Sequence, residues 1–124
     1  MTDMDAFQTS APFCVTPEHS YAEFLAAVAR RDFDAVLARL CARQADRLRA
    51  CRARRGFEHH FEMWCRKYPR GLQVAACYVD GDTAILETSA ESGALAGRVT
   101  MVLDDDAWYV LNESWDACAV GIAA

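Results

Sequence analysis

The chain has 124 residues, the usual size of a single domain, which can bury a core of its own but is too short for two domains. With 53% hydrophobic and 25% charged residues, its composition is that of an ordinary globular protein. Its charge-free stretches fall well short of the roughly 20 residues that span a bilayer, so we expect no transmembrane helix.

The net charge of −5 conceals two parts of opposite charge. Residues 30–70 contain twelve of the thirteen basic side chains and five acidic ones, a balance of +7. The rest of the chain contains one basic and thirteen acidic side chains, a balance of −12. This asymmetry indicates either two faces that pack against each other, a charged surface that steers a partner, or simply solvated faces.

The first residues are acidic where an export signal is basic, and no apolar run precedes Cys14, so we expect a cytoplasmic protein. In that compartment the six cysteines are expected to be reduced thiols. Cys14 and Cys118, near the two ends, are the better candidates for reactive thiols. Four others are expected in the core or at its border: Cys41, Cys51, Cys65 and Cys77.

A helix is predicted to begin after Thr16. Residues 1–15 are polar and aperiodic, so we expect a flexible arm there, followed by one domain over 16–117 and a tail over 118–124. Thr16 can cap free amides, Pro17 has a helical φ, and Glu18 places a negative charge in the first turn. This helix should run to about Arg31, with an apolar face that includes Tyr21, Phe24, Leu25 and Val28.

A second helical segment is predicted from Phe33, with Asp32 as its cap. Its apolar positions fall on one face as far as Cys51, which indicates one amphipathic helix, or two in near register, ending by Gly56. Four arginines fall on another face of this segment, and we call them the arginine stripe: Arg39, Arg43, Arg47 and Arg54.

After Gly56 the apolar phase changes. Phe57, Phe61, Trp64 and Tyr68 are spaced by four, three and four residues, which predicts a third helical segment with an aromatic face. This segment should end at Tyr68, because Pro69 follows.

The rest of the chain predicts antiparallel strands. Residues 72–79 and 83–89 flank an Asp-Gly-Asp turn, and residues 95–103 and 108–115 flank three aspartates, Asp104 to Asp106. Helices followed by an antiparallel meander define an α+β fold, with the N-terminal helices packed against a strongly curved sheet.

No cofactor or metal site is predicted. His59 and His60 are neighbours, and neighbouring helical residues point about 100° apart, so they cannot both bind one ion from a regular helix. Cys51 lies about 12 Å from His59 along a helix axis, too far for a shared ion. No cysteine has a histidine at the spacing of a known nucleophile–base pair.

The arginine stripe is the best nucleic-acid signal in the sequence, since guanidinium groups along a helix can follow phosphates. Nucleic acid is nevertheless disfavoured. No aromatic residue alternates with these arginines, Asp46 interrupts them, and the net charge is negative.

Three stretches together resemble the nuclear transport factor 2-like superfamily, which includes ketosteroid isomerases and SnoaL-like cyclases. They are TPEHSYAEFLAAVARRDFDAVLARL, YVDGDTAILETS and GRVTMVLDDDAWYVLNESW, within Thr16 to Trp115. The resemblance implies a cone-shaped α+β fold, with helices packed into a bent sheet, a pocket at the open end, and dimers formed through the sheet.

The catalytic residues of the isomerases do not carry over. The position of their tyrosine donor is Phe24, and the region of their aspartate base is arginine-rich, so we predict no catalytic residue and a hollow without polar chemistry. Two glutamates, Glu87 and Glu113, are each interpreted either as pocket acids or as solvent-side residues of an alternating strand. The candidates for lining the pocket are Tyr21, Phe24, Tyr78, Glu87, Trp108 and Glu113.

The resulting first hypothesis is a non-catalytic, dimeric binding protein that holds a partner through the sheet face, the pocket mouth or the helix that carries the arginine stripe. A bacterial immunity protein that neutralises a toxin or effector is one such case. The alternative is a SnoaL-like or isomerase-like enzyme that acts on a small hydrophobic substrate. A third reading is an accessory domain whose partner is encoded nearby.

Overall fold

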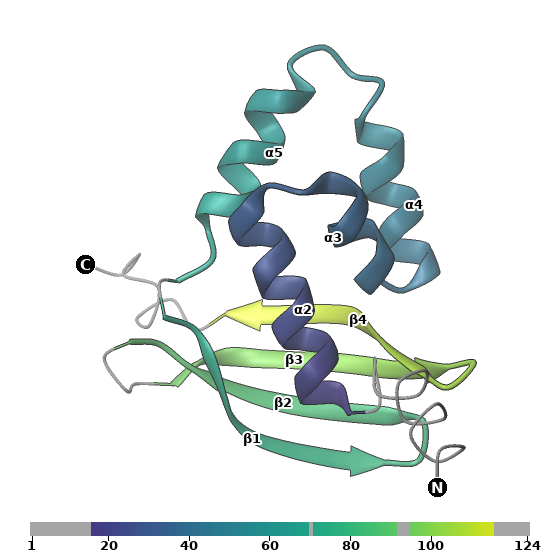
Figure 1. The fold of residues 1–124 in the computed structure, drawn as a ribbon, viewed down its shortest axis with the longest axis vertical. Coiled ribbons are helices and arrows are strands. Elements are labelled where there is room, and N and C mark those ends of the chain that lie inside the picture. Colours follow the sequence, from purple (N-terminus) through teal and green to yellow (C-terminus); the bar gives the residue numbers. More distant parts are fainter. Residues whose placement is uncertain (1–15, 70, 92–94, 116–124) are drawn as a thin grey trace, which may run out of the picture.

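The computed structural model describes residues 16–69, 71–91 and 95–115. Helices precede strands, as the α+β prediction required (Figure 1). The helices are α2 (Pro17–Arg30), α3 (Phe33–Arg39), α4 (Ala42–Cys51) and α5 (Phe57–Arg66). The strands are β1 (Gln73–Asp80), β2 (Thr83–Ser89), β3 (Leu95–Asp104) and β4 (Ala107–Trp115). The predicted arm and tail, with Cys14 and Cys118, lie outside the described residues.

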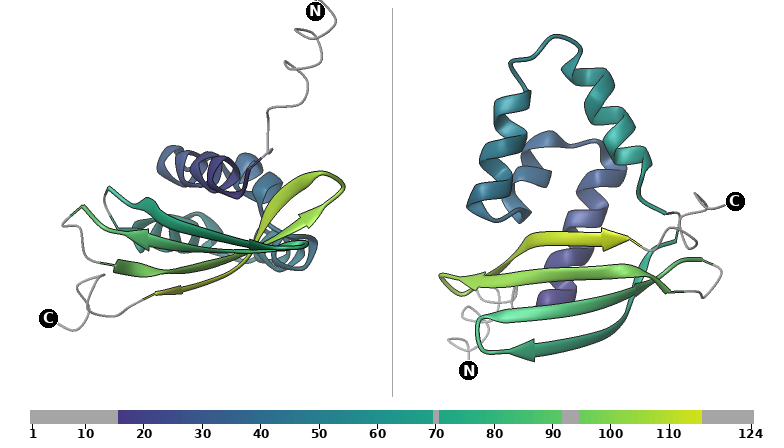
Figure 2. Two further views of the ribbon diagram at one scale, coloured as in Figure 1. Left: turned by 90° about the horizontal axis from the view of Figure 1, so that it is seen from below. Right: turned by 180° about the vertical axis from the view of Figure 1, so that it is seen from behind.

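The four strands form one antiparallel sheet in the order β1-β2-β3-β4, which confirms the predicted meander. The sheet is open, and it twists and bends along its length (Figure 2). Helix α2 crosses one face of the sheet, whereas α4 and α5 extend beyond its β4 edge (Figure 1). Within the described residues no helix is long and apolar enough to cross a membrane.

Both predicted helix caps are present. The Thr16 hydroxyl accepts a hydrogen bond from the His19 amide at 3.1 Å, and the Asp32 carboxylate accepts one from the Ala35 amide at 3.1 Å. Each satisfies an amide that has no partner within its own helix. The first two predicted helices therefore begin where the sequence places them.

The second helical segment is divided between α3 and α4. Leu40 adopts an extended conformation and pairs with Val110 of β4, and the Cys41 amide donates to the Val110 carbonyl at 2.8 Å. This contact with the sheet interrupts the helix, although apolar periodicity continues through it. The arginine stripe is therefore not one helical face: Arg39 ends α3, and Arg54 follows the end of α4.

The core lies between α2 and the sheet, where Tyr21 and Phe24 are fully buried. Phe24 contacts Trp64 and Tyr68 edge-on, with ring centroids 6.3 and 5.9 Å apart. The aromatic face predicted for the third helical segment thus packs onto α2. Helix α5 ends at Arg66, and Tyr68 lies just beyond it.

Candidate functional site

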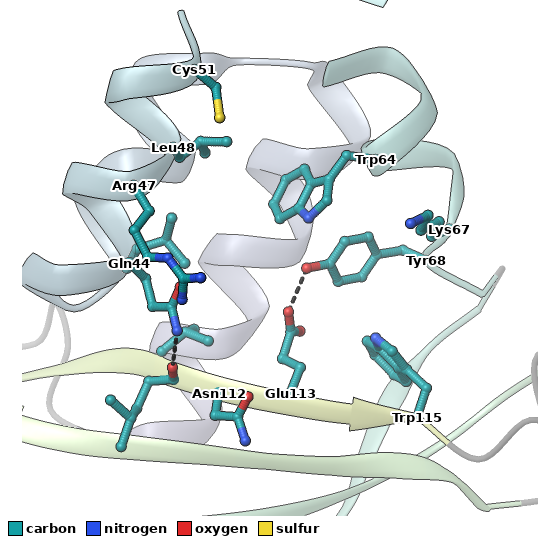
Figure 3. Close-up of a pocket in the computed structure, with 13 residues that line it drawn as sticks. Gln44, Arg47, Leu48, Cys51, Trp64, Lys67, Tyr68, Asn112, Glu113 and Trp115 are labelled. Carbon is teal, nitrogen blue, oxygen red and sulfur yellow. Dashed lines mark hydrogen bonds between the residues drawn. The ribbon is translucent and has the colours of Figure 1, made fainter. Parts of the chain in front are cut away.

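A pocket of about 410 Å³ opens between α4, the C-terminal end of α5 and β4 (Figure 3). Its walls combine aliphatic and aromatic side chains with one acidic group. Residues that define these walls are Leu48, Cys51, Trp64, Tyr68, Glu113 and Trp115.

The acidic group is Glu113, and two tyrosines hold its carboxyl. The Tyr21 hydroxyl donates to Oε2 at 2.6 Å, and the Tyr68 hydroxyl donates to Oε1 at 2.5 Å (Figure 3 shows the second bond). Both carboxyl oxygens therefore have a donor. Tyr68 lines the pocket beside Glu113, whereas Tyr21 is fully buried behind it.

A β-bulge turns Glu113 toward the helices. Met101 pairs with Val110, but the next pair is Thr100 with Asn112, which leaves Leu111 without a partner in β3. Because side chains alternate along a strand, one extra residue reverses the faces beyond it. Glu113 then lies opposite the buried Val99, on the same side of the sheet as Val110.

Burial raises the pKa of the Glu113 carboxyl above its ordinary value. The two tyrosine hydrogen bonds oppose that rise, because they stabilise the charged form, but they do not cancel it. The pKa values of Tyr21 and Tyr68 are raised as well, first by burial and then by the charge of Glu113. The hydroxyls thus remain protonated donors, and Glu113 is the group in this network whose carboxyl gains or loses a proton most readily.

Aromatic packing fixes the two tyrosine rings. The Tyr21 ring stacks on Phe24 at 5.7 Å between centroids. The Tyr68 ring makes edge contacts with Trp64 at 5.4 Å and with Trp115 at 5.5 Å. Rings held on several sides keep their hydroxyls aimed at the carboxyl, so the site is preorganised without a ligand.

The opening of the pocket carries polar and basic side chains. The Gln44 side-chain amide donates to the carbonyl of the bulged Leu111 at 2.9 Å, which ties α4 to β4. Arg47 extends from α4 on one wall, and Lys67 follows α5 on the other (Figure 3). Both cationic side chains are exposed.

Two of the six predicted pocket residues meet at this site: Glu113 lines it and Tyr21 bonds to Glu113. Phe24 packs behind them in the core. Trp108 is buried, and its carbonyl accepts a hydrogen bond from the Ser20 hydroxyl.

The remaining two candidates lie elsewhere on the sheet. Tyr78 of β1 is 58% exposed. The Glu87 carboxylate of β2 lies 3.8 Å from the Arg98 guanidinium of β3. Neither belongs to the pocket lining.

The expectation of a hollow without polar chemistry is wrong, because Glu113 and Tyr68 lie in it. Tyr21, three residues before Phe24 on the same helical face, directs its hydroxyl to the Glu113 carboxyl. Sequence reasoning placed Tyr68 only in an apolar face, and its hydroxyl was the available signal of a polar role.

The members of the arginine stripe have different surroundings. Arg39 is partly buried and donates to the Ser20 hydroxyl at 3.4 Å, while Arg47 lines the pocket. Arg43 and Arg54 are exposed. The predicted continuous basic surface is therefore replaced by separate positions, of which one belongs to the pocket.

The histidines and cysteines lie apart from this chemistry, except Cys51. His59 and His60 are both exposed, and among the described residues no group of three His, Cys, Asp or Glu side chains is placed to hold a metal ion. Cys65 is buried, Cys41, Cys51 and Cys77 are partly buried, and all four are free thiols. Their positions agree with the predicted places in the core or at its border.

Comparison with known proteins gives one structural likeness. No family model matches the sequence, and no curated protein matches it. The structure is similar to that of an NTF2-like protein of unknown function from Cytophaga hutchinsonii, with 14% identity and a TM-score of 0.43, over 84% of this chain and 93% of the other.

Proposed function

We propose that the protein binds a small, largely apolar molecule in the pocket between α4, α5 and β4, and that Glu113 and Tyr68 make its polar contact. The observation that carries this proposal is the protonatable carboxyl of Glu113 in a pocket whose walls include the side chains of Leu48, Trp64 and Trp115. Ligand sites combine such walls with a few placed polar groups.

The size of the pocket and the free-energy cost of burying an acid in it support this proposal. A volume of about 410 Å³ falls in the range of about 300–1,000 Å³ that small-molecule sites occupy. Desolvating a carboxyl is unfavourable, and a leucine in its place would pack without that cost. A perturbed acid facing a cavity is a recognised mark of a functional site.

Binding can be measured with N-phenyl-1-naphthylamine, a neutral aromatic probe whose fluorescence rises in an apolar site. We expect saturable binding to the wild-type protein. Leu48→Trp adds an indole to the pocket wall and should abolish it. The matched control is Ala50→Trp, which places the same indole on an exposed position of α4 outside the lining and should leave binding unchanged.

Two results would overturn the proposal. One is the absence of saturable binding to the folded wild-type protein. The other is equal loss of binding in Leu48→Trp and Ala50→Trp, which would place the probe elsewhere. Circular dichroism spectra of both variants establish that they are folded.

An enzyme acting on such a molecule is a second candidate, and the raised pKa of Glu113 favours it. A general base works best when its pKa lies near the working pH. If Glu113 accepts protons from bound substrates, the protein should speed deuterium exchange next to the carbonyl of 2-indanone, a small apolar ketone. NMR should show that exchange falls to the buffer rate in Glu113→Gln; equal rates in wild type and variant would remove this candidate.

A protein partner, including a toxin neutralised by an immunity protein, stays a prediction, as does a homodimer. The surface predicted for that contact, the arginine stripe, is divided among α3, α4 and the segment after α4. We therefore place the small-molecule pocket ahead of the protein-partner hypothesis.

A further inference from the structure

We propose that the molecule bound in this pocket is an amphipathic anion with an apolar and preferably aromatic body. Arg47 and Lys67 bind its acidic oxygen group at the opening, while its other end makes the polar contact with Glu113 and Tyr68. This inference rests on the proposed small-molecule pocket and specifies its ligand class. The geometry that carries it is the placement of two cationic side chains on opposite walls of the opening (Figure 3).

Arg47 and Lys67 differ from neighbouring basic residues in their partners. Carboxylates lie beside several other arginines: Glu62 beside Arg31 and Arg66, Asp46 beside Arg49, and Asp34 beside Arg52. Among the described residues neither Arg47 nor Lys67 has such a carboxylate, although both line the pocket. Their charges are therefore available to a ligand.

The acid inside the pocket does not balance these two cations. Glu113 is the one acidic side chain in the described lining, and both of its oxygens already accept a tyrosine hydroxyl. Burial also raises the pKa of Glu113, which favours its neutral, protonated form. The pocket is thus electropositive at its opening, within a chain whose net charge is −5.

A cationic ligand fits this arrangement poorly. The faces of the aromatic rings could bind a cation through cation–π contacts, but Arg47 and Lys67 would repel that cation at the opening. An anion meets the reverse conditions. The planar guanidinium of Arg47 can donate two parallel hydrogen bonds to a carboxylate or sulfonate, and the Lys67 ammonium adds a point charge.

The ring system of such a ligand has a surface to pack against. Trp64, Tyr68 and Trp115 lie next to one another along one wall, with centroid distances of 5.4 and 5.5 Å between successive rings. Flat apolar groups bind well between aromatic faces of this kind. The acidic group would then project from these rings toward the opening, away from Glu113.

Two probes that differ in a single group test the inference. 8-Anilinonaphthalene-1-sulfonate is N-phenyl-1-naphthylamine with one added sulfonate. Binding of the sulfonate is measured by its displacement of the neutral probe, so both report on the same pocket. We expect Arg47→Gln to lower the affinity for the sulfonate probe by about two- to fivefold, because one exposed ion pair contributes about that much. The affinity for the neutral probe should change little.

Lys67→Gln should act in the same direction, and the two losses should multiply if the cations contribute independently. Arg43→Gln is the matched control, because it removes an exposed arginine of α4 that does not line the pocket. Raising the salt concentration should weaken binding of the sulfonate probe and leave binding of the neutral probe nearly unchanged.

The possible failures can be told apart. If the neutral probe binds but Arg47→Gln and Lys67→Gln leave the ratio of the two affinities unchanged, the anionic ligand class is wrong and the pocket stands. An equal change in Arg43→Gln would also overturn the inference, since the effect would then come from overall charge. If neither probe binds the folded protein, the proposed function fails and this inference fails with it.

Discussion

Replacing Tyr21 by phenylalanine removes one hydroxyl from the Glu113 carboxyl and keeps the ring in place. Tyr21 is fully buried and stacks on Phe24, so the shorter side chain leaves the packing of α2 unchanged. What is lost is the 2.6 Å hydrogen bond to Oε2. The carboxyl then retains only the bond from Tyr68.

The expected cost follows from the charge of the acceptor. A hydrogen bond to an ionised group contributes about 1.5–3 kcal/mol, and one between neutral groups about 0.5–1.5 kcal/mol. Tyr21→Phe should therefore lower the free energy of unfolding by about 1.5–3 kcal/mol at pH 8, where more of Glu113 is ionised. At pH 4, below even the ordinary glutamate pKa of about 4.3, the loss should be nearer the neutral range, because the raised pKa leaves Glu113 mostly protonated there.

Urea denaturation of four proteins measures this interaction directly: the wild type, Tyr21→Phe, Glu113→Gln and the double variant. Glutamine keeps the size of the acid and removes its charge. In the Glu113→Gln background, Tyr21→Phe should cost about 0.5–1.5 kcal/mol, so the midpoints of the two ranges leave a coupling free energy of about 1 kcal/mol at pH 8. If Tyr21→Phe costs the same with glutamate and with glutamine, at both pH values, the reasoning is refuted.

Three further changes test other parts of the structure. The folded protein holds the Glu113 proton more tightly than the unfolded chain does. The free energy of unfolding that this proton contributes is therefore complete below about pH 4.3 and is lost as the pH rises through the folded pKa. Urea titrations from pH 4 to 9 should show this decline in the wild type and not in Glu113→Gln, and parallel curves for the two proteins would contradict it. Gly97→Ala would place a Cβ 2.3 Å from the Ser114 carbonyl oxygen and 2.9 Å from the Trp115 ring; we expect a loss of about 1–3 kcal/mol, and an unchanged melting temperature would argue against the close strand approach. Phe24→Ala should cost about 3–5 kcal/mol in urea denaturation, and a loss below about 1 kcal/mol would show that α2 is not anchored by this ring.

The elements of the fold were predictable because their signals are local. Thr16 and Asp32 cap the helices that their positions predicted, and the Asp-Gly turn before Asp82 joins β1 and β2. Leu40 shows where local signals fail. Its apolar position continues a helical pattern, but pairing with Val110, seventy residues later, outweighs that pattern.

The site was less predictable because it depends on a bulge. Strict alternation from the buried Trp108 and Val110 places Glu113 on the opposite face of β4, and the unpaired Leu111 reverses this. No glycine or proline marks the bulge in the sequence. The bond to Tyr68 is also a long-range contact, which spacing along the chain cannot reveal.

The central claim is that Glu113 is a protonatable acid inside a binding pocket, and its carboxyl can be titrated directly. Carbon-13 NMR of the glutamate carboxyls, with the Glu113 signal identified by its loss in Glu113→Gln, gives its pKa in the folded protein. We predict a value above the ordinary range of glutamate, and a further rise in Tyr21→Phe. Titration of Glu113 at or below the value of an exposed glutamate would contradict the account.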